Sequence, residues 1–164
     1  MAHTKRGLWS EPGVPHKGWR CVDMQDAYDY QDYLDVCEMC TTADIRYIHY
    51  MEHDDYPDPL RVGCICAENM EEDYVAPRER EKRFISERKR KNTWIDKRWK
   101  VSRKGNDWKQ EGMWLFTIFQ SYTGNSYKLF IKNDITGDGV VTPTAYPTPY
   151  DAKLAAWDFL QKRT

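Results

Sequence analysis

The sequence of 164 residues lacks a hydrophobic run long enough to cross a membrane. No apolar stretch approaches the roughly 20 residues of a bilayer-spanning helix, and Met1–Arg6 is not followed by the apolar core of a secretion signal. Glycine-rich phosphate loops, dinucleotide-binding motifs and a Ser/His/Asp set are also missing. These absences predict a cytoplasmic protein with no membrane contact and no evident small-molecule substrate.

Cysteine is scarce, but its placement is informative. Four of the five cysteines form two close pairs, Cys37 with Cys40 and Cys64 with Cys66. In a reducing compartment close pairs favour metal binding over disulfides, and structural Zn²⁺ takes four thiolates in a tetrahedron at about 2.3 Å. These four cysteines are therefore predicted to hold one structural zinc ion. The remaining Cys21 is expected to be a half-buried apolar side chain.

The chain between the two pairs predicts a hairpin. Residues 44–52 are rich in β-branched and aromatic side chains, residues 54–59 have turn composition, and residues 60–63 return as a second strand. Cys64 then begins a short helix, whose N-terminal dipole suits a metal-bound thiolate. A cysteine knuckle, a hairpin and further ligands at a helix start make up the treble-clef arrangement.

The residues around this hairpin resemble a group of known proteins. Their pattern is Cys37-x-x-Cys40, Ile45-Arg46-Tyr47, His49, Met51-Glu52-His53, Tyr56-Pro57, Leu60, Val62-Gly63-Cys64-Ile65-Cys66-Ala67 and Asp73-Tyr74. At these positions the chain is similar to small bacterial and phage treble-clef zinc-finger proteins without an assigned activity. The resemblance implies a zinc site and no particular mechanism.

One departure from the treble-clef pattern leaves the ligand set open. One residue separates Cys64 from Cys66 where treble clefs have two, so His53 is the alternative fourth ligand. Treble clefs also frame HNH-type nucleases, in which a hairpin histidine activates water and a second metal holds the phosphate. His49 and His53 are the candidate catalytic residues of that alternative. The following helix has Met70-Glu71-Glu72 where such a nuclease needs another histidine, so a non-enzymatic role is favoured.

Charge is distributed unevenly along the chain, although the net charge is −1. Between Asp23 and Asp73 there are fifteen acidic and two basic residues, and between Arg78 and Lys104 there are thirteen basic and four acidic residues. Such asymmetry is typical of a protein with a nucleic-acid or protein partner, or of two segments that neutralise each other.

The basic segment contains the leading candidates for partner binding. Residues 78–91 predict a mostly solvated helix. Eight side chains are predicted to contact the phosphates of DNA or RNA: Arg88, Lys89, Arg90, Lys91, Lys97, Arg98, Arg103 and Lys104. Trp94 and Trp99 lie among them and are expected on the core side of a strand, with stacking on unpaired bases as the alternative. The leading function is a zinc-binding, nucleic-acid-binding accessory or regulatory protein.

The acidic segment supports a different function. Aspartates recur every third residue from Asp23 to Asp35, interleaved with Tyr28, Tyr30 and Tyr33. On a helix this spacing makes a negative stripe, although aspartate is a poor interior helix former and an irregular segment is equally compatible. The alternative function is a protein-binding inhibitor or adaptor whose acidic face imitates DNA and engages a basic protein partner.

Together these patterns predict an α+β protein in four parts. The parts are an N-terminal arm (1–22) held by Trp9 and Trp19, the acidic segment and treble-clef zinc module (23–76), a basic connecting helix (77–96), and a three-stranded antiparallel sheet with a C-terminal helix (97–164). The strands are expected at residues 113–121, 126–132 and 140–145. Thr148, Pro149 and Asp151 predict the start of the last helix.

Overall fold

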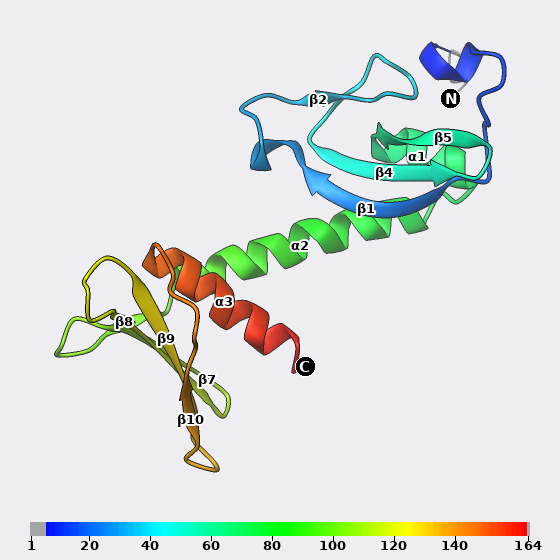
Figure 1. Cartoon of the computed structure of the whole chain (residues 1–164). Helices are drawn as coiled ribbons and strands as arrows, with labels where there is room; N and C mark the ends of the chain where they lie inside the picture. Colours follow the sequence, from blue (N-terminus) through cyan, green and yellow to red (C-terminus); the bar gives the residue numbers. More distant parts are fainter. Residues whose placement is uncertain (1–5, 164) are drawn as a thin grey trace. The chain divides into compact units, whose positions relative to one another are not determined.

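The computed structural model describes residues 6–163, in an α+β chain that divides into two compact units, Met1–Glu87 and Arg88–Thr164 (Figure 1). The division falls inside the long helix α2 (Ala76–Asp96), which therefore belongs to both units. Within residues 6–163, no helix is both long enough and apolar enough to pass through a membrane.

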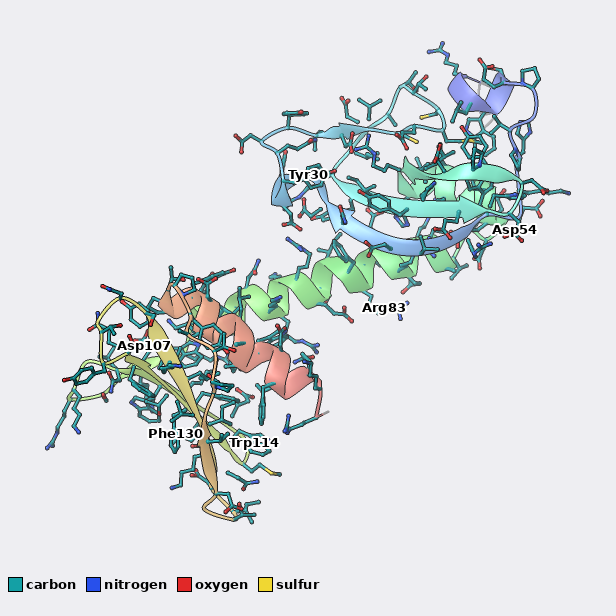
Figure 2. All side chains as sticks on the ribbon, viewed as in Figure 1. Tyr30, Asp54, Arg83, Asp107, Trp114 and Phe130 are labelled. Carbon is teal, nitrogen blue, oxygen red and sulfur yellow. The ribbon has the colours of Figure 1, made fainter. Side chains whose placement is uncertain are left out.

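Unit 1 is built on a three-stranded antiparallel sheet. Its order is β1 (Arg20–Asp26), β4 (Tyr47–His53) and β5 (Tyr56–Val62). β4 and β5 form the predicted hairpin, with Asp54 at its tip (Figure 2). The turn is shorter than residues 54–59, because Pro57 and Pro59 lie within β5. β5 is an edge strand, where proline is tolerated.

The segments that carry the cysteines pack beside this sheet. β2 (Asp35–Val36) and β3 (Asp44–Ile45) form a two-stranded ribbon around the loop of Cys37 and Cys40. α1 (Cys64–Glu71) begins at Cys64, as predicted, directly after β5. Gly63 is required at this junction, because a Cβ there would lie 2.7 Å from Cγ2 of Ile45.

The N-terminal arm is held by its two tryptophans, as predicted. Trp9, in the 3-10 helix η1 (Gly7–Ser10), is 9% exposed and Trp19 is 3% exposed. The arm reaches the cysteine loop, where the amide of Leu8 donates to the carbonyl of Met39 at 2.9 Å. A Cβ on Gly7 would lie 2.7 Å from Thr41, so glycine permits this close approach.

The acidic segment is not a helix with one carboxylate stripe. Its residues belong to β1, to the 3-10 helix η2 (Ala27–Asp29) and to β2. Asp26 is buried and pairs with Arg46 at 3.0 Å, and Asp35 pairs with Arg61 at 3.0 Å. Asp26 and Asp35 are therefore neutralised within unit 1, because the strands turn them toward arginines.

α2 is longer than the helix predicted from residues 78–91. Asp73 caps its start by accepting the amides of Val75 at 2.9 Å and Ala76 at 2.8 Å, which lowers the pKa of Asp73. Near its end, Trp94 and Ile95 are buried in the core of unit 2. The expectation that Trp94 faces the core is confirmed, whereas its assignment to a strand is wrong.

The predicted three-stranded sheet of unit 2 is wrong, because the sheet has five antiparallel strands. Its order is β10 (Gly139–Val141), β9 (Tyr127–Asn133), β8 (Trp114–Gln120), β7 (Asp107–Glu111) and β6 (Lys100–Val101). The sequence reasoning missed β6 and β7. In β7 the buried side chain is Lys109, while Trp108 points to the opposite face, which reverses the usual hydrophobic alternation.

α3 (Pro149–Gln161) begins as predicted, with the Thr148 hydroxyl accepting the amide of Asp151 at 3.2 Å. The helix packs against β8 and β9 on one face of the sheet (Figure 1). The core between them contains Trp94, Ile95, Phe116, Ile118, Leu129, Ile131, Ala152, Ala156 and Trp157.

Candidate metal centre

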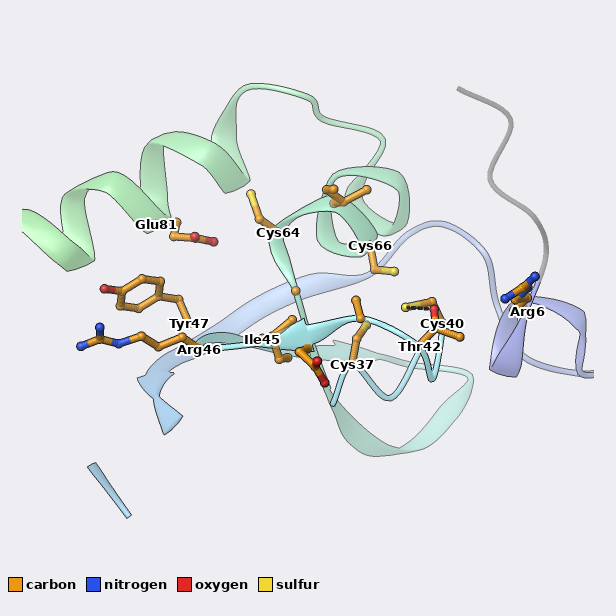
Figure 3. A pocket seen from close by; sticks show the side chains of 14 residues that line it. Arg6, Cys37, Cys40, Thr42, Ile45, Arg46, Tyr47, Cys64, Cys66 and Glu81 are labelled. Carbon is orange, nitrogen blue, oxygen red and sulfur yellow. Dashed lines mark hydrogen bonds between the residues drawn. The ribbon is translucent and has the colours of Figure 1, made fainter. Parts of the chain in front are cut away.

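Three cysteine sulfurs gather in the interior of unit 1. Cys37 and Cys40 come from the loop between β2 and β3, and Cys66 comes from the first turn of α1. All three are buried, and their Sγ atoms lie within 4.8 Å of one another (Figure 3). Sulfurs around a tetrahedral ion with 2.3 Å metal–sulfur bonds would be about 3.8 Å apart. The three side chains are therefore close enough to hold a metal ion.

The backbone of the cysteine loop favours negative charge on sulfur. The Thr41 amide donates to the Cys37 carbonyl at 2.8 Å in a tight turn, with Thr41 at a φ of 61°. The pKa of the Cys37 thiol is lowered, first by its hydrogen bond with Cys66 and then by the amides of Cys40, Gly63 and Met39. The pKa of Cys66 is raised by the same contact and by burial. The Cys37–Cys66 contact thus favours one thiolate shared between the two sulfurs.

Trp9 supplies a second sign that this site suits thiolates. Its indole Nε1 is buried without a hydrogen-bond acceptor among the described residues. The same group lies close enough to Cys66 to lower its pKa, against the larger raising effects. A thiolate is a better acceptor than a thiol, so loss of the Cys66 proton to a metal would give this indole a partner.

The structure places Cys64 away from the other three cysteines. Cys64 and Cys66 occupy positions i and i+2 of α1, which point about 200° apart on a helix. The Cys64 sulfur turns toward Glu81 of α2 (Figure 3). Burial, followed by the negative charges of Glu81 and Glu68, raises the pKa of Cys64 to about 12. Cys64 is therefore neither a ready thiolate ligand nor an activated nucleophile in this arrangement.

His49 lies with Cys64 and Glu81 in a second group of metal-type side chains, whose donor atoms are within 4.8 Å of one another. The His49 ring is fully buried. Its Nδ1 accepts from Arg80 at 3.1 Å, so the proton is on Nε2, which donates to Glu81 at 2.9 Å. Arg80 is in turn fixed by an ion pair with Glu71 at 2.7 Å. The histidine has no lone pair left for a metal or for activating water.

His53 lies elsewhere and serves the hairpin. Its Nδ1 accepts the amide of Asp55 at 3.0 Å, and its ring packs against Trp19 at 5.3 Å. Among the described residues, His53 belongs to neither group of potential metal ligands. The two histidines proposed for a nuclease thus do not converge on one site.

A pocket of ≈ 510 Å³ opens beside the three sulfurs (Figure 3). It is lined by Arg6, Cys37, Cys40, Thr42, Ala43, Asp44, Ile45, Arg46, Tyr47, Gly63, Cys64, Ile65, Cys66 and Glu81. All three clustered cysteines line this pocket, so it offers space for an ion and a fourth ligand beside them. The sequence did not predict that Trp9 lies beside Cys66 or that Glu81 lies beside Cys64, because these contacts join segments that are distant in sequence.

The predicted phosphate contacts all belong to unit 2, but they do not form one stripe. Residues 88–91 are consecutive in α2, so their side chains are distributed around the helix at about 100° intervals. Arg90 lies over the ring of Trp157 at 5.8 Å. Five of the remaining bases are exposed: Lys89, Lys97, Arg98, Arg103 and Lys104.

Comparison with known proteins identified no relative of this chain. No protein-family model, curated protein or solved structure matches the chain. Within the described residues, the buried group of Cys37, Cys40 and Cys66 could hold a metal ion.

Proposed function

We propose that the protein is a zinc-binding, non-enzymatic nucleic-acid-binding protein with an accessory or regulatory role. The observation that carries this proposal is the division of charge between the units. Arg88–Thr164 contains fifteen basic and seven acidic residues, a net charge of +8, whereas Met1–Glu87 contains ten basic and nineteen acidic residues, a net charge of −9. A compact unit of +8 suits a polyanion.

The acidic unit neutralises part of its own charge through ion pairs within unit 1. Within unit 1, Arg78 pairs with Glu68, Arg80 with Glu71 and Arg61 with Asp35. The basic segment is thus divided: its first arginines are engaged with carboxylates of α1, and its exposed bases from Lys89 onward supply the proposed phosphate contacts.

A binding assay tests this proposal directly. Fluorescence anisotropy with labelled DNA and RNA, repeated at several salt concentrations, would measure affinity and its salt dependence. We expect the combined variant Lys89→Glu, Lys97→Glu and Arg103→Glu to bind more weakly, with a salt slope smaller by about one for each lost phosphate contact. Arg83→Glu, on the same helix but in unit 1, is the matched control. A variant that binds like the wild type would reject the proposal.

The metal in this proposal is zinc, held by Cys37, Cys40 and Cys66. Zn²⁺ favours thiolates and a tetrahedral site, and binding would join the cysteine loop to α1 in a unit that is small for its own core. The treble-clef resemblance agrees with this role. A reducing, cytoplasmic environment, which we include in the proposal, would keep the thiols available. Elemental analysis of the purified chain is expected to find about one zinc per chain, retained in Cys21→Ser. Metal-free native protein would reject the zinc site.

Nuclease activity is not part of the proposal. His49 is buried with both ring nitrogens engaged, and His53 is engaged at the hairpin turn. We expect plasmid DNA to stay intact after incubation with the protein and Mg²⁺ or Mn²⁺. Cleavage that disappears in His49→Ala would instead support the nuclease.

Protein binding remains a second candidate because of one exposed segment of unit 1. Within nine residues the side chains of Tyr28, Tyr30, Tyr33, Leu34 and Val36 are each at least 39% exposed. Aspartates lie between them, so the segment combines apolar contact area with negative charge, as a surface for a basic protein would. Loss of a captured partner on Tyr33→Ser and Asp32→Asn, with nucleic-acid affinity unchanged, would favour this candidate.

A further inference from the structure

The five-stranded sheet has one face that α3 does not cover, and its side chains follow from the strand register. On the core face, Lys109, Phe116 and Ile131 are adjacent across three strands. The next position along each strand points to the opposite face. We call this opposite face the open face. Its members are Lys100, Trp108, Gln110, Leu115, Thr117, Phe119, Lys128, Phe130, Lys132 and Val141.

The aromatic residues of the open face do not belong to the core. Trp108, Phe119 and Phe130 are partly exposed, and none of them is among the residues that form or pack against the hydrophobic core of unit 2. Other aromatic side chains, such as Trp94 and Trp157, fill the hydrophobic core of unit 2. Three ring side chains thus lie on the sheet outside the hydrophobic core of unit 2.

A small side chain, Thr117, lies between two rings at the centre of the open face. Trp108 and Phe130 flank Thr117 across three strands, about 10 Å apart at the usual strand spacing. Phe130 lies over Gly139 of β10, where an added Cβ would be 2.5 Å from the ring carbon Cζ. Glycine at this position therefore lets the Phe130 ring lie across the edge of the sheet.

Lysines lie opposite three of the apolar members of the open face. Lys100 pairs with Trp108, Lys128 with Phe119 and Lys132 with Leu115 in the strand register. The Lys100 Nζ is 5.1 Å from the Trp108 ring centroid, and Lys128 donates to the Pro143 carbonyl at 2.9 Å. Trp108, Phe119 and Leu115 thus each have a lysine directly across from them, whereas Phe130 pairs with Thr117 and Val141.

We propose that the open face binds single-stranded nucleic acid, with unpaired bases stacked on Trp108, Phe119 and Phe130 and the neighbouring lysines near the phosphates. This inference rests on the proposed function and specifies its ligand. Ring faces among cations on a net-positive unit complement a strand that has exposed bases and negative phosphates. A duplex does not fit as well, because its bases are already stacked on one another.

The test uses full-length protein with labelled 12-nucleotide oligothymidylate, oligouridylate and a 12-base-pair duplex. Trp108→Leu, Phe119→Leu and Phe130→Leu keep apolar volume and remove the ring. Each is expected to weaken single-strand binding by about 5- to 150-fold and duplex binding by less than about twofold. Tyr122→Leu is the control, because Tyr122 is an exposed aromatic in the β8–β9 turn. Circular dichroism confirms folding.

The outcomes separate this inference from the proposed function. If the leucine variants bind oligothymidylate like the wild type while the charge-reversed variant has lost binding, base stacking on the open face is rejected and nucleic-acid binding stands. Tighter binding of the duplex than of the single strand also overturns the inference. If the wild type retains none of the three probes, both proposals fall.

A second measurement uses only the wild-type protein, so it does not depend on whether the variants fold. Ultraviolet crosslinking of oligothymidylate to the wild-type protein, followed by peptide mapping, is expected to give adducts at Trp108, Phe119 or Phe130. Adducts confined to peptides outside β7, β8 and β9 would contradict the inference.

Discussion

At the scale of single residues, the candidate site depends on which way each cysteine points. Sequence spacing identified the cysteine loop and the helix start, and Cys37, Cys40 and Cys66 do come together. The direction of Cys64 could not be read from spacing alone, because it depends on whether the helix begins before or after that residue. Since α1 begins at Cys64, the two thiols lie on different sides of the helix.

This geometry predicts unequal effects of two serine substitutions. Cys66→Ser removes one of the three clustered sulfurs and is expected to lower zinc affinity by more than the roughly 10- to 100-fold that loss of an outer partner costs. Cys64→Ser is expected to stay within that range. Competition with a chromophoric chelator measures both. Equal losses would mean that Cys64 rotates into the site as a fourth ligand.

Trp9 carries a related prediction. Trp9→Phe keeps the ring packing and removes the buried indole N–H near Cys66. If that group stabilises a metal-bound thiolate, zinc affinity is expected to fall by up to about tenfold, while the thermal midpoint of the metal-free protein changes little. Titration calorimetry and thermal denaturation distinguish the two quantities. An unchanged zinc affinity would show that the indole is only a packing group.

At the scale of elements, the predictable parts were those whose side chains follow ordinary periodicity. The hairpin of β4 and β5, the strands β8 and β9, and the capped start of α3 all have strong local patterns. β7 was missed because its inward side chain is a lysine, Lys109, whose burial depends on hydrogen bonds to a segment distant in sequence. Its Nζ donates to the carbonyl of Trp94 at 3.0 Å and to that of Lys97 at 3.4 Å, where α2 ends.

Replacing this lysine is expected to loosen the join between β7 and the end of α2. Lys109→Met should lower the free energy of unfolding of unit 2 at neutral pH by about 1 to 3 kcal/mol, because two helix-terminal carbonyls lose a charged donor. Urea denaturation, followed by tryptophan fluorescence, measures the change. Lys128→Met, on the open face, is the control and is expected to cost less.

The same lysine predicts a pH dependence. Burial lowers the pKa of Lys109 below its ordinary value of 10.5, so between the two pKa values the unfolded chain binds more protons than the folded chain. The free energy of unfolding of the wild type should therefore increase relative to that of Lys109→Met as the pH rises from the folded-state pKa of Lys109 toward 10.5. A difference that shrinks with rising pH would contradict the assigned environment.

At the scale of the whole chain, the candidate metal ligands and the proposed phosphate contacts belong to different units. The cysteine group lies in Met1–Glu87, and the eight bases proposed to contact phosphates lie in Arg88–Thr164. Counting charges along the sequence located this asymmetry, but not the division point, which falls inside a continuous helix that local pattern cannot subdivide. The fate of each charge also depended on tertiary pairing, as with Asp26 and Arg46.

Metal removal is therefore expected to act locally. A chelator should increase hydrogen exchange at the amides of the cysteine loop and the first turn of α1, because the metal would contribute to stability only where it is bound. Exchange at β8 and β9 should stay unchanged. Mass spectrometry of peptides from both units checks the pattern, and equal deprotection of the two would contradict it.

The inverted order of Trp108 and Lys109 in β7 has a genetic consequence. In saturation mutagenesis scored only for folded protein, position 109 should accept few amino acids and position 108 many. In a selection that requires retention of single-stranded nucleic acid, position 108 should become the restrictive one. Two neighbouring codons would then report separately on the scaffold and on its ligand.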